Sequence, residues 1–444
     1  MVKKIFYILS FVLVLNIVGC SSEPDEPGNN PPDEEQKAPD SKPEPDPEPD
    51  TDPEPEPVYE FLAGELFITT EGNQSITSKE NYIPCLITLN HLKEEWNLND
   101  VEAGIRGRGN SSWEWYPKKP YRIKFEKKQP MLGLPEAKSW VLLAEYRDPT
   151  DLMNAFVFEL GQQIGLPYTN HNRYVEVTLN GKYIGMYHLT EQVQQNKYRV
   201  NIDEKTGYLL ELDRDDGPEL SPGASDNFWS EIYRMPICVK NPDEPTVIQI
   251  EEAKTELALL EVAIKNSQWK EINHLLDVQS MIDYLIIQEL VYNVELDAPR
   301  SMYMHKDIGE KWIMGPLWDF DAGFDFDWST MYTGHTFFRD YKELVLGTNP
   351  ANHSGTIYRV PGFFSDLFKI KDFKDQYKER WAVVYEMIKP AWDITYEYYF
   401  NNRDAYAREA ECWPIEKKYA SELTKLQTWL NNRKKYLNDI INNY

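Results

Sequence analysis

The chain has 444 residues and a formal net charge of −26, with 73 acidic and 47 basic side chains. This length allows one large domain or two lobes with a substantial hydrophobic core. The acidity argues against nucleic acid as a partner, because a nucleic-acid-binding surface must be basic.

The first twenty residues, MVKKIFYILSFVLVLNIVGC, have the three parts of a secretion signal. Lys3 and Lys4 precede an apolar run that is too short for a membrane-spanning helix and ends in a small residue before Cys20. The ending IVGC resembles a bacterial lipobox. We therefore expect residues 1–19 to be a lipoprotein signal peptide and Cys20 to be lipidated, which anchors an exported protein at the outer membrane or cell surface.

The next segment, residues 20–57, is predicted to be a disordered stalk. Residues 21–57 contain 14 acidic residues, two lysines and 12 prolines. A segment with so few apolar side chains cannot offset the entropy of ordering by burial. At roughly 3.1 Å per residue in polyproline II, it would hold the folded part on the order of 100 Å from the lipid.

The first folded part, residues 58–195, is predicted to be β-rich. Short alternating runs between residues 61 and 105 are typical of strands. The stretch YVEVTLNGKYIGMYHLTE predicts a hairpin that turns at Asn180 and Gly181.

One helix is predicted within this β-rich part, over residues 151–164. Its apolar residues recur at helical spacing, Thr150 or Asp151 would cap its start, and Gly165 would end it.

The remaining part, residues 196–444, is predicted to be mainly helical, apart from a hairpin in SMYMHKDIGEKWIMGPLW. Helical periodicity marks four stretches, residues 249–266, 278–295, 364–388 and 420–443. The composition and pattern thus predict an α+β fold.

Several familiar sites are excluded. The sequence has no HExxH, Walker or GxSxG motif, and its histidines do not cluster. The aspartate run after Gly315 is no EF-hand, because Gly323 and Phe324 stand where that loop needs Asp or Asn and then Gly. Cys85, Cys238 and Cys412 are too few and too widely spaced for a disulfide framework or a zinc site.

The stretch GIRGRGNSSWEWYPKKPYRIKF is the first candidate site. Its glycines allow close backbone approach to a ligand, Arg106 and Arg108 add positive charge, and Asn110 and Ser111 add short polar groups. Lys124 follows on the next predicted strand. The pattern suits a phosphate-binding loop; a tight hairpin with solvated cations is the alternative.

The second candidate site is formed by aspartates. Asp297 follows a predicted helix, and Asp319 ends the predicted strand WIMGPLW 22 residues later. Phosphoryl transfer needs one carboxylate for the attacking hydroxyl, another for Mg²⁺ and a cation on the phosphates. Asp297, Asp319 and Lys124 would fill these roles; an acidic, solvated turn is the alternative.

The sequence resembles the CotH kinase family, named after spore coat protein H. The likeness rests on IRGRGNSSW with KKPYRIKF, LNGKYIGMYHLTEQV, NVELDAPRSMYMHKD and GPLWDFDAGF, in this order over roughly residues 100–330. The resemblance implies a two-lobed, atypical protein-kinase-like fold with a β-rich N-terminal lobe and a mainly helical C-terminal lobe. It also implies that ATP with Mg²⁺ or Mn²⁺ is used to phosphorylate Ser or Thr of protein partners.

Site residues follow from the same resemblance. Lys124 resembles the nucleotide-binding lysine, with Glu159 as its paired glutamate, and Glu191 would lie near the adenine. Asp297 resembles the catalytic aspartate. Asp319 resembles the metal-binding aspartate, and Asp321 is a second candidate ligand. Ser301 stands near the position where such loops often carry an asparagine that binds a second metal ion.

Two other classes of function remain open. One is a surface-exposed scaffold that keeps the fold without catalysis and contacts glycans or proteins, which the 13 Trp and 28 Tyr would suit. The other is a glycosidase that uses Asp319 and Asp321 as its paired carboxylates, for which the sequence shows no general acid.

Overall fold

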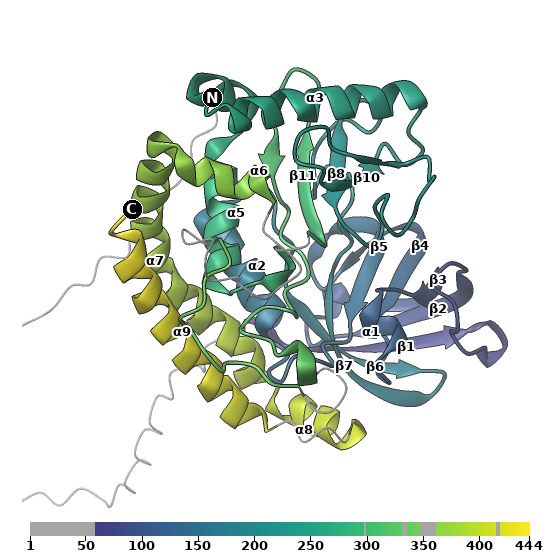
Figure 1. The fold of residues 1–444 in the computed structure, drawn as a ribbon. Coiled ribbons are helices and arrows are strands. Elements are labelled where there is room, and N and C mark those ends of the chain that lie inside the picture. Colours follow the sequence, from purple (N-terminus) through teal and green to yellow (C-terminus); the bar gives the residue numbers. More distant parts are fainter. Residues whose placement is uncertain (1–57, 297–298, 331–334, 347–360, 414–417) are drawn as a thin grey trace, which may run out of the picture. The chain divides into compact units, whose positions relative to one another are not determined.

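The computed structural model describes residues 58–296, 299–330, 335–346, 361–413 and 418–444 (Figure 1). The chain divides into two units, Met1–Glu56 and Pro57–Tyr444. The predicted signal peptide and stalk, with Cys20, lie outside the described residues. The second unit is a mixed α+β structure, with a β-rich N-terminal region and a helical C-terminal region. The predicted α+β class is therefore confirmed.

The N-terminal region is a closed barrel with the strand order β1-β2-β3-β4-β5-β7-β6. β1 and β6 are parallel, whereas the other neighbours are antiparallel. The strands are β1 (Gly64–Thr70), β2 (Ile83–Asn90), β3 (Leu98–Gly107), β4 (Tyr121–Met131), β5 (Leu134–Leu143), β6 (Arg173–Leu179) and β7 (Lys182–Glu191).

The barrel has its own core. Ile105 of β3 and Ile123 of β4 are partners in register and are fully buried inside it. Because side chains alternate along a strand, the neighbouring partners Arg106 and Arg122 lie on the outer face. The pleat thus places two arginines side by side on one face of the barrel.

The predicted hairpin is confirmed. β6 and β7 are joined by Asn180 and Gly181, with φ of 50° and 76°. Two consecutive left-handed residues define the turn that matches the twist of paired strands, and Asn-Gly is the pair that adopts it most readily.

A second sheet follows the barrel in sequence, with the order β12-β11-β8-β10-β9. Its strands are β8 (Tyr208–Leu212), β9 (Asn227–Trp229), β10 (Pro236–Asn241), β11 (Met302–Lys306) and β12 (Ile313–Met314). The hairpin of β11 and β12 was predicted. The other three strands were missed: β8 and β10 are buried on both faces and show no alternation, and β9 has only three residues.

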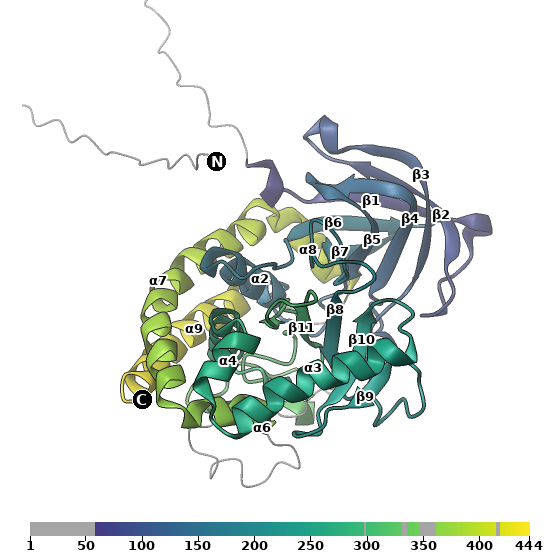
Figure 2. The ribbon, with the colours of Figure 1, turned by 90° about the horizontal axis from the view of Figure 1, so that it is seen from above.

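The helices are α1 (Ser111–Glu114), α2 (Met153–Ile164), α3 (Val247–Lys265), α4 (Trp269–Leu275), α5 (Val278–Leu290), α6 (Gly362–Ser365), α7 (Lys371–Asn401), α8 (Arg403–Cys412) and α9 (Tyr419–Ile441). α3 lies across the second sheet, as Figure 2 shows. α2 packs against α7, and α7 and α9 lie on the side of the molecule away from the barrel strands (Figures 1 and 2). Short 3-10 turns include Val294–Leu296, directly after α5.

The start of α2 differs from the prediction. The helix begins at Met153, and its first N–H donates to the carboxylate of Asp148 at 2.7 Å rather than to Thr150 or Asp151. Asp148 also accepts the N–H of Thr150 at 2.7 Å. The cap was missed because Asp148 lies five residues before the helix and reaches it through a loop.

Candidate functional site

A cavity of about 440 Å³ lies within the Pro57–Tyr444 unit, lined by the barrel's outer face, the second sheet and the loops that follow them. Two groups among its lining residues are of interest. The cation wall comprises Arg106, Arg108, Asn110, Ser111 and Arg122, and the carboxylate wall comprises Glu295, Ser301, Asp319 and Asp321. The structure thus brings seven of the predicted site residues together, and adds Arg122 and Glu295.

The arginines of the cation wall are only partly exposed. The Nε atoms of Arg106 and Arg122 are buried and have no hydrogen-bond partner within the described chain. The guanidinium of Arg108 lies 5.2 Å from the ring centre of Trp318. Burial lowers the pKa of Arg108, although Asp319 acts against this effect. The wall therefore presents guanidinium donors that are not all used in hydrogen bonds with the described residues.

The loop between β3 and α1 completes this wall. Gly109 has φ of 80°, and a Cβ there would lie 2.2 Å from the Oγ of Ser112, so only glycine fits. The carbonyl of Asn110 accepts the N–H of Trp113 at 3.2 Å, which starts the short helix at Ser111. The glycine-rich motif thus forms a tight turn beside the cavity.

Asp319 and Asp321 of the carboxylate wall lie on the loop after β12, whereas Ser301 directly precedes β11 and Glu295 lies in the turn Val294–Leu296. Asp319 has φ of 61°, and Ser301 Oγ lies 3.5 Å from its Oδ2. Burial, together with the nearby charge of Asp321, raises the pKa of Asp319 to about 7. Arg147 donates to Asp321 in an ion pair. Two carboxylates are therefore held close together, and one of them is already paired.

Glu295 is a member of this wall that the sequence analysis missed. It is 7% exposed, and its Oε2 has no hydrogen-bond partner among the described residues. Burial raises its pKa well above the usual range, and Asp319 and Asp321 add to the effect. The only signal in the sequence was its position two residues before the predicted catalytic Asp297.

Asp297 itself lies outside the described residues. The residues that flank it, Glu295 on one side and Arg300 and Ser301 on the other, line the cavity.

A lysine of the second sheet also faces the cavity. Lys240 of β10 pairs with Glu211 of β8 at 2.7 Å and with Asp216 at 3.0 Å. Burial alone would lower the pKa of Lys240. The nearby charges of Glu211 and Asp216 outweigh burial, so the pKa of Lys240 is raised. This pair was missed because its strands were missed.

Lys124 and Glu159 do not line the cavity. Lys124 is exposed, two residues beyond Arg122 on the same face of β4, with its Nζ 5.9 Å from the ring centre of Tyr82. Glu159 accepts a hydrogen bond from Gln163 on its own helix at 2.8 Å. The expected pairing of Lys124 with Glu159 is absent from the contacts of the described residues, and the lysine–glutamate pair in the cavity is Lys240 with Glu211.

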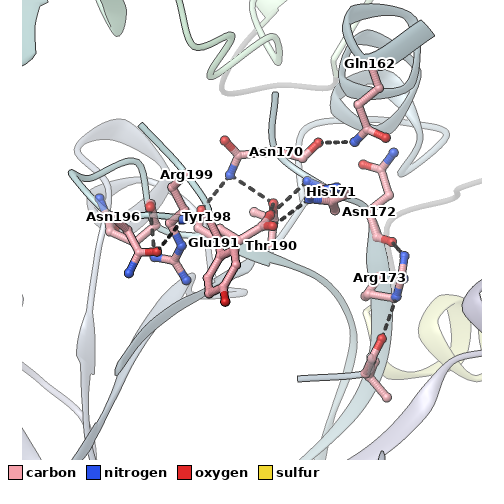
Figure 3. A network of polar contacts seen from close by, with 12 residues as sticks. Gln162, Asn170, His171, Asn172, Arg173, Thr190, Glu191, Asn196, Tyr198 and Arg199 are labelled. Atoms are coloured by element: carbon pink, nitrogen blue, oxygen red, sulfur yellow. Dashed lines mark hydrogen bonds and ion pairs between the residues drawn. The ribbon is translucent and has the colours of Figure 1, made fainter. Parts of the chain in front are cut away.

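Glu191 lies just outside the cavity, in the polar network of Figure 3. It is 3% exposed and accepts hydrogen bonds from the backbone N–H of His171 at 2.9 Å and its ring at 2.7 Å. Burial would raise its pKa, but the contacts with His171 outweigh burial and lower it. Glu191 thus fixes the end of β7, where the chain turns into the cavity lining at Gln192.

Three general properties bear on the site. Within the described ranges, no group of three or more His, Cys, Asp or Glu side chains is arranged to hold a metal ion. Cys85, Cys238 and Cys412 are free thiols. No helix in the part of the chain that the structure describes is long and apolar enough to span a membrane.

The fold and the cavity define an α+β protein with a cavity that is lined by both arginines and carboxylates. The family model described as CotH kinase protein matches residues 105–437, which is most of the chain. The protein therefore belongs to the CotH kinase family, and the predicted resemblance is confirmed. Membership suggests a CotH-like atypical kinase and implies ATP as the nucleotide. No curated protein matches the chain.

Proposed function

We propose that this protein is a CotH-like phosphotransferase that uses ATP with Mg²⁺ or Mn²⁺ to phosphorylate Ser or Thr side chains of protein partners. Family membership supports the kinase class. The observation that carries the proposal is that one cavity is lined both by guanidinium donors and by the two neighbouring carboxylates of Asp319 and Asp321. Phosphoryl transfer needs such positioning and electrostatic stabilisation more than covalent chemistry by the protein.

The cation wall fits phosphate groups. Guanidinium groups match phosphate geometry and bind it through paired hydrogen bonds. The buried Nε atoms of Arg106 and Arg122 lack partners among the described residues, so each has a hydrogen bond left to donate. Leaving a buried donor unsatisfied is costly, which favours a bound anion at this place.

The carboxylate wall fits a hard divalent cation. Carboxylate and hydroxyl oxygens are the protein ligands that Mg²⁺ prefers, and Mg²⁺ sites often use one or two carboxylates together with phosphate oxygens. Asp319 and the Oγ of Ser301 would hold the ion, and the unpartnered Oε2 of Glu295 lies on the same wall. When bound, the cation neutralises phosphate charge. A site completed by phosphate oxygens is compatible with fewer than three carboxylates.

The chain's own groups would act as follows. Asp319 must lose its proton to bind a cation, and its pKa of about 7 allows this near neutral pH. Arg147 holds Asp321, while buried Trp318 and Phe320 keep water from the back of the loop. We assign to Asp297 the orientation of the acceptor hydroxyl and the acceptance of its proton.

The kinase-like architecture and the location of the protein are part of the proposal. The barrel would serve as the N-terminal lobe, and the second sheet with its helices as the C-terminal lobe. The lipobox-like IVGC supports export and anchoring through Cys20, with residues 20–57 as a spacer that allows the catalytic part to reach protein partners away from the lipid surface.

A second candidate is a surface-exposed binding protein that keeps the fold without catalysis. The ion pair of Arg147 with Asp321 favours it, because this pair occupies a carboxylate that a second metal ion would use.

The deciding experiment is a calorimetric titration of the full chain with ATP, with and without Mg²⁺ or Mn²⁺. We expect metal-dependent binding that Asp319→Ala removes. Asp327→Ala is the matched control, because Asp327 belongs to the same motif but accepts hydrogen bonds from Ser329 on the surface side. Absence of ATP binding under every condition would refute the phosphotransferase and leave the binding protein.

A further inference from the structure

We propose that Asn154 is a positioning residue that holds the loop of Asp319 and Asp321 in its ligand-binding geometry, and that Glu145 and His188 orient Asn154. This inference rests on the proposed function, because it concerns the same cavity. None of the three residues was singled out by the sequence, and Asn154 acts through the backbone of the loop rather than on a reacting atom.

The central contact joins α2 to the loop. Asn154 lies in the first turn of α2, is 4% exposed and lines the cavity. Its Oδ1 accepts the backbone N–H of Phe320 at 2.8 Å. Phe320 stands between Asp319 and Asp321, so this hydrogen bond fixes the peptide group that joins Asp319 to Phe320.

The loop needs such a restraint because of its backbone conformation. Asp319 has φ of 61°, a left-handed conformation that is uncommon for a residue with a Cβ, although aspartate adopts it more often than most. Gly323 follows closely, and its N–H donates to the carbonyl of Phe320 at 3.1 Å. Phe320 is therefore bonded through both its N–H and its carbonyl, and Asn154 supplies the only one of the two bonds that comes from outside the loop.

The orientation of the Asn154 amide is itself fixed. Its Nδ2 lies 3.2 Å from each carboxylate oxygen of Glu145. A carboxylate accepts and cannot donate, so the NH₂ group must face Glu145 and the oxygen must face the N–H of Phe320. Glu145 Oε1 is in turn 3.1 Å from Nδ1 of His188, which is 1% exposed and stacked on Tyr174.

This chain of contacts starts from rigid elements. His188 belongs to β7 of the barrel, and α2 is held at its start by the carboxylate of Asp148. Arg147, from the same connection between β5 and α2, pairs with Asp321. The loop is thus held at two points, by the charge of Arg147 in the connection and by the neutral hydrogen bond of Asn154 in the first turn of α2. Only the bond from Asn154 uses neither carboxylate.

The test compares Asn154→Ala with Asn172→Ala in the full chain. Asn172 is also a buried asparagine that bonds to α2, since its Nδ2 donates to the carbonyl of Ala155 at 3.0 Å, but it makes no contact with the loop among the described residues. The first readout is hydrogen–deuterium exchange of the segment that contains Phe320. The second is the Mg²⁺ concentration that gives half-maximal ATP binding, measured by calorimetry.

We expect Asn154→Ala to speed exchange of the Phe320 amide at least tenfold and to raise the required Mg²⁺ concentration about 10- to 100-fold, as for other residues that orient metal ligands. Asn172→Ala should change neither readout, even if both variants lose similar thermal stability. Unchanged exchange in Asn154→Ala, or equal losses in both variants, would overturn the inference.

A charge swap keeps the test usable if Asn154→Ala does not fold. Asn154→Asp retains an oxygen that can accept the N–H of Phe320, but it places a second carboxylate against Glu145. We expect it to change both readouts in the same direction as Asn154→Ala. Adding Glu145→Gln restores a donor–acceptor pair and should rescue both readouts; failure of this rescue would contradict the orienting role. If the unmodified chain shows no metal-dependent ATP binding, the proposed function fails, whereas binding that is insensitive to Asn154 defeats this inference alone.

Discussion

The two walls of the cavity are built in different ways. The arginines of the cation wall stand on or beside β3 and β4, where the pleat and the strand register fix their direction. The carboxylate wall stands on loops, where Ser301 and Asp319 adopt left-handed conformations with φ of 53° and 61°. Strands thus position one half of the site by local geometry, while the other half depends on tertiary contacts that hold unfavourable loops in place.

The walls also differ in their response to protons. Burial lowers the pKa of Arg108 and Arg122, but a guanidinium stays protonated at any physiological pH. Burial raises the pKa of Asp213, which also lines the cavity, and of Asp319 to about 7 each. Only the carboxylate side of the cavity therefore changes its charge near neutral pH.

The largest expected effect comes from breaking the contact that holds the carboxylate wall. Arg147→Met should lower the free energy of unfolding by on the order of 3 kcal/mol, because it leaves the mostly buried Asp321 without its partner. Urea unfolding followed by circular dichroism measures this difference. Adding Asp321→Asn removes the unpaired charge and should recover most of the loss. A single variant as stable as the parent chain would show that the ion pair does not hold the loop.

A second prediction concerns pH and the same wall. Between about pH 4 and 7, Asp319 keeps its proton in the folded chain but loses it in the unfolded one, so the folded state binds more protons and stability falls as pH rises. Without metal, this contribution falls by on the order of 2 kcal/mol between pH 5 and 7.5. Asp319→Asn should remove it, so its urea midpoints should decline less than those of the parent chain from pH 5 to 7.5. If the urea midpoints of Asp319→Asn and of the parent chain declined in parallel, the pKa of Asp319 would not be raised.

The sequence predicted those parts of the site that belong to compact motifs. Arg106, Arg108 and Ser111 lie within ten residues of one another and remain together in the fold, because a tight turn at Gly109 joins them. Asp319 lies five residues beyond the short strand β12 and lines the cavity together with these residues. Local patterns carry this information because strand alternation and turn geometry are themselves local.

The parts that could not be predicted depend on distant contacts. Lys240 and Glu211 meet because β8 and β10 are neighbours in a sheet whose apolar strands gave no alternating signal. Asn154 reaches Phe320 across 166 positions of sequence. Side-chain alternation put Arg122 and Lys124 on one face, yet it could not tell which of them reaches the cavity.

The third prediction tests whether Arg122 of β4, rather than Lys124, contacts the nucleotide. Arg122→Gln should weaken ATP binding about tenfold, since a guanidinium that contacts phosphate contributes roughly 1 to 2 kcal/mol through a charge-assisted hydrogen bond. Calorimetry with Mg²⁺ present gives the affinity. The loss should shrink at high ionic strength if charge carries it. An unchanged affinity would remove Arg122 from the site, although it lines the cavity.

The smallest expected effect is that of Lys124→Gln. Lys124 is exposed on the same strand face as Arg122 but does not line the cavity, so its loss should change the affinity for ATP less than twofold. The two substitutions remove one positive charge each from β4, two residues apart, so a general loss of charge would affect both alike. A tenfold loss of ATP affinity in Lys124→Gln alone would instead make Lys124 the nucleotide-binding lysine that the family resemblance implies. The strand or the lysine side chain would then have to turn toward the cavity when the nucleotide binds.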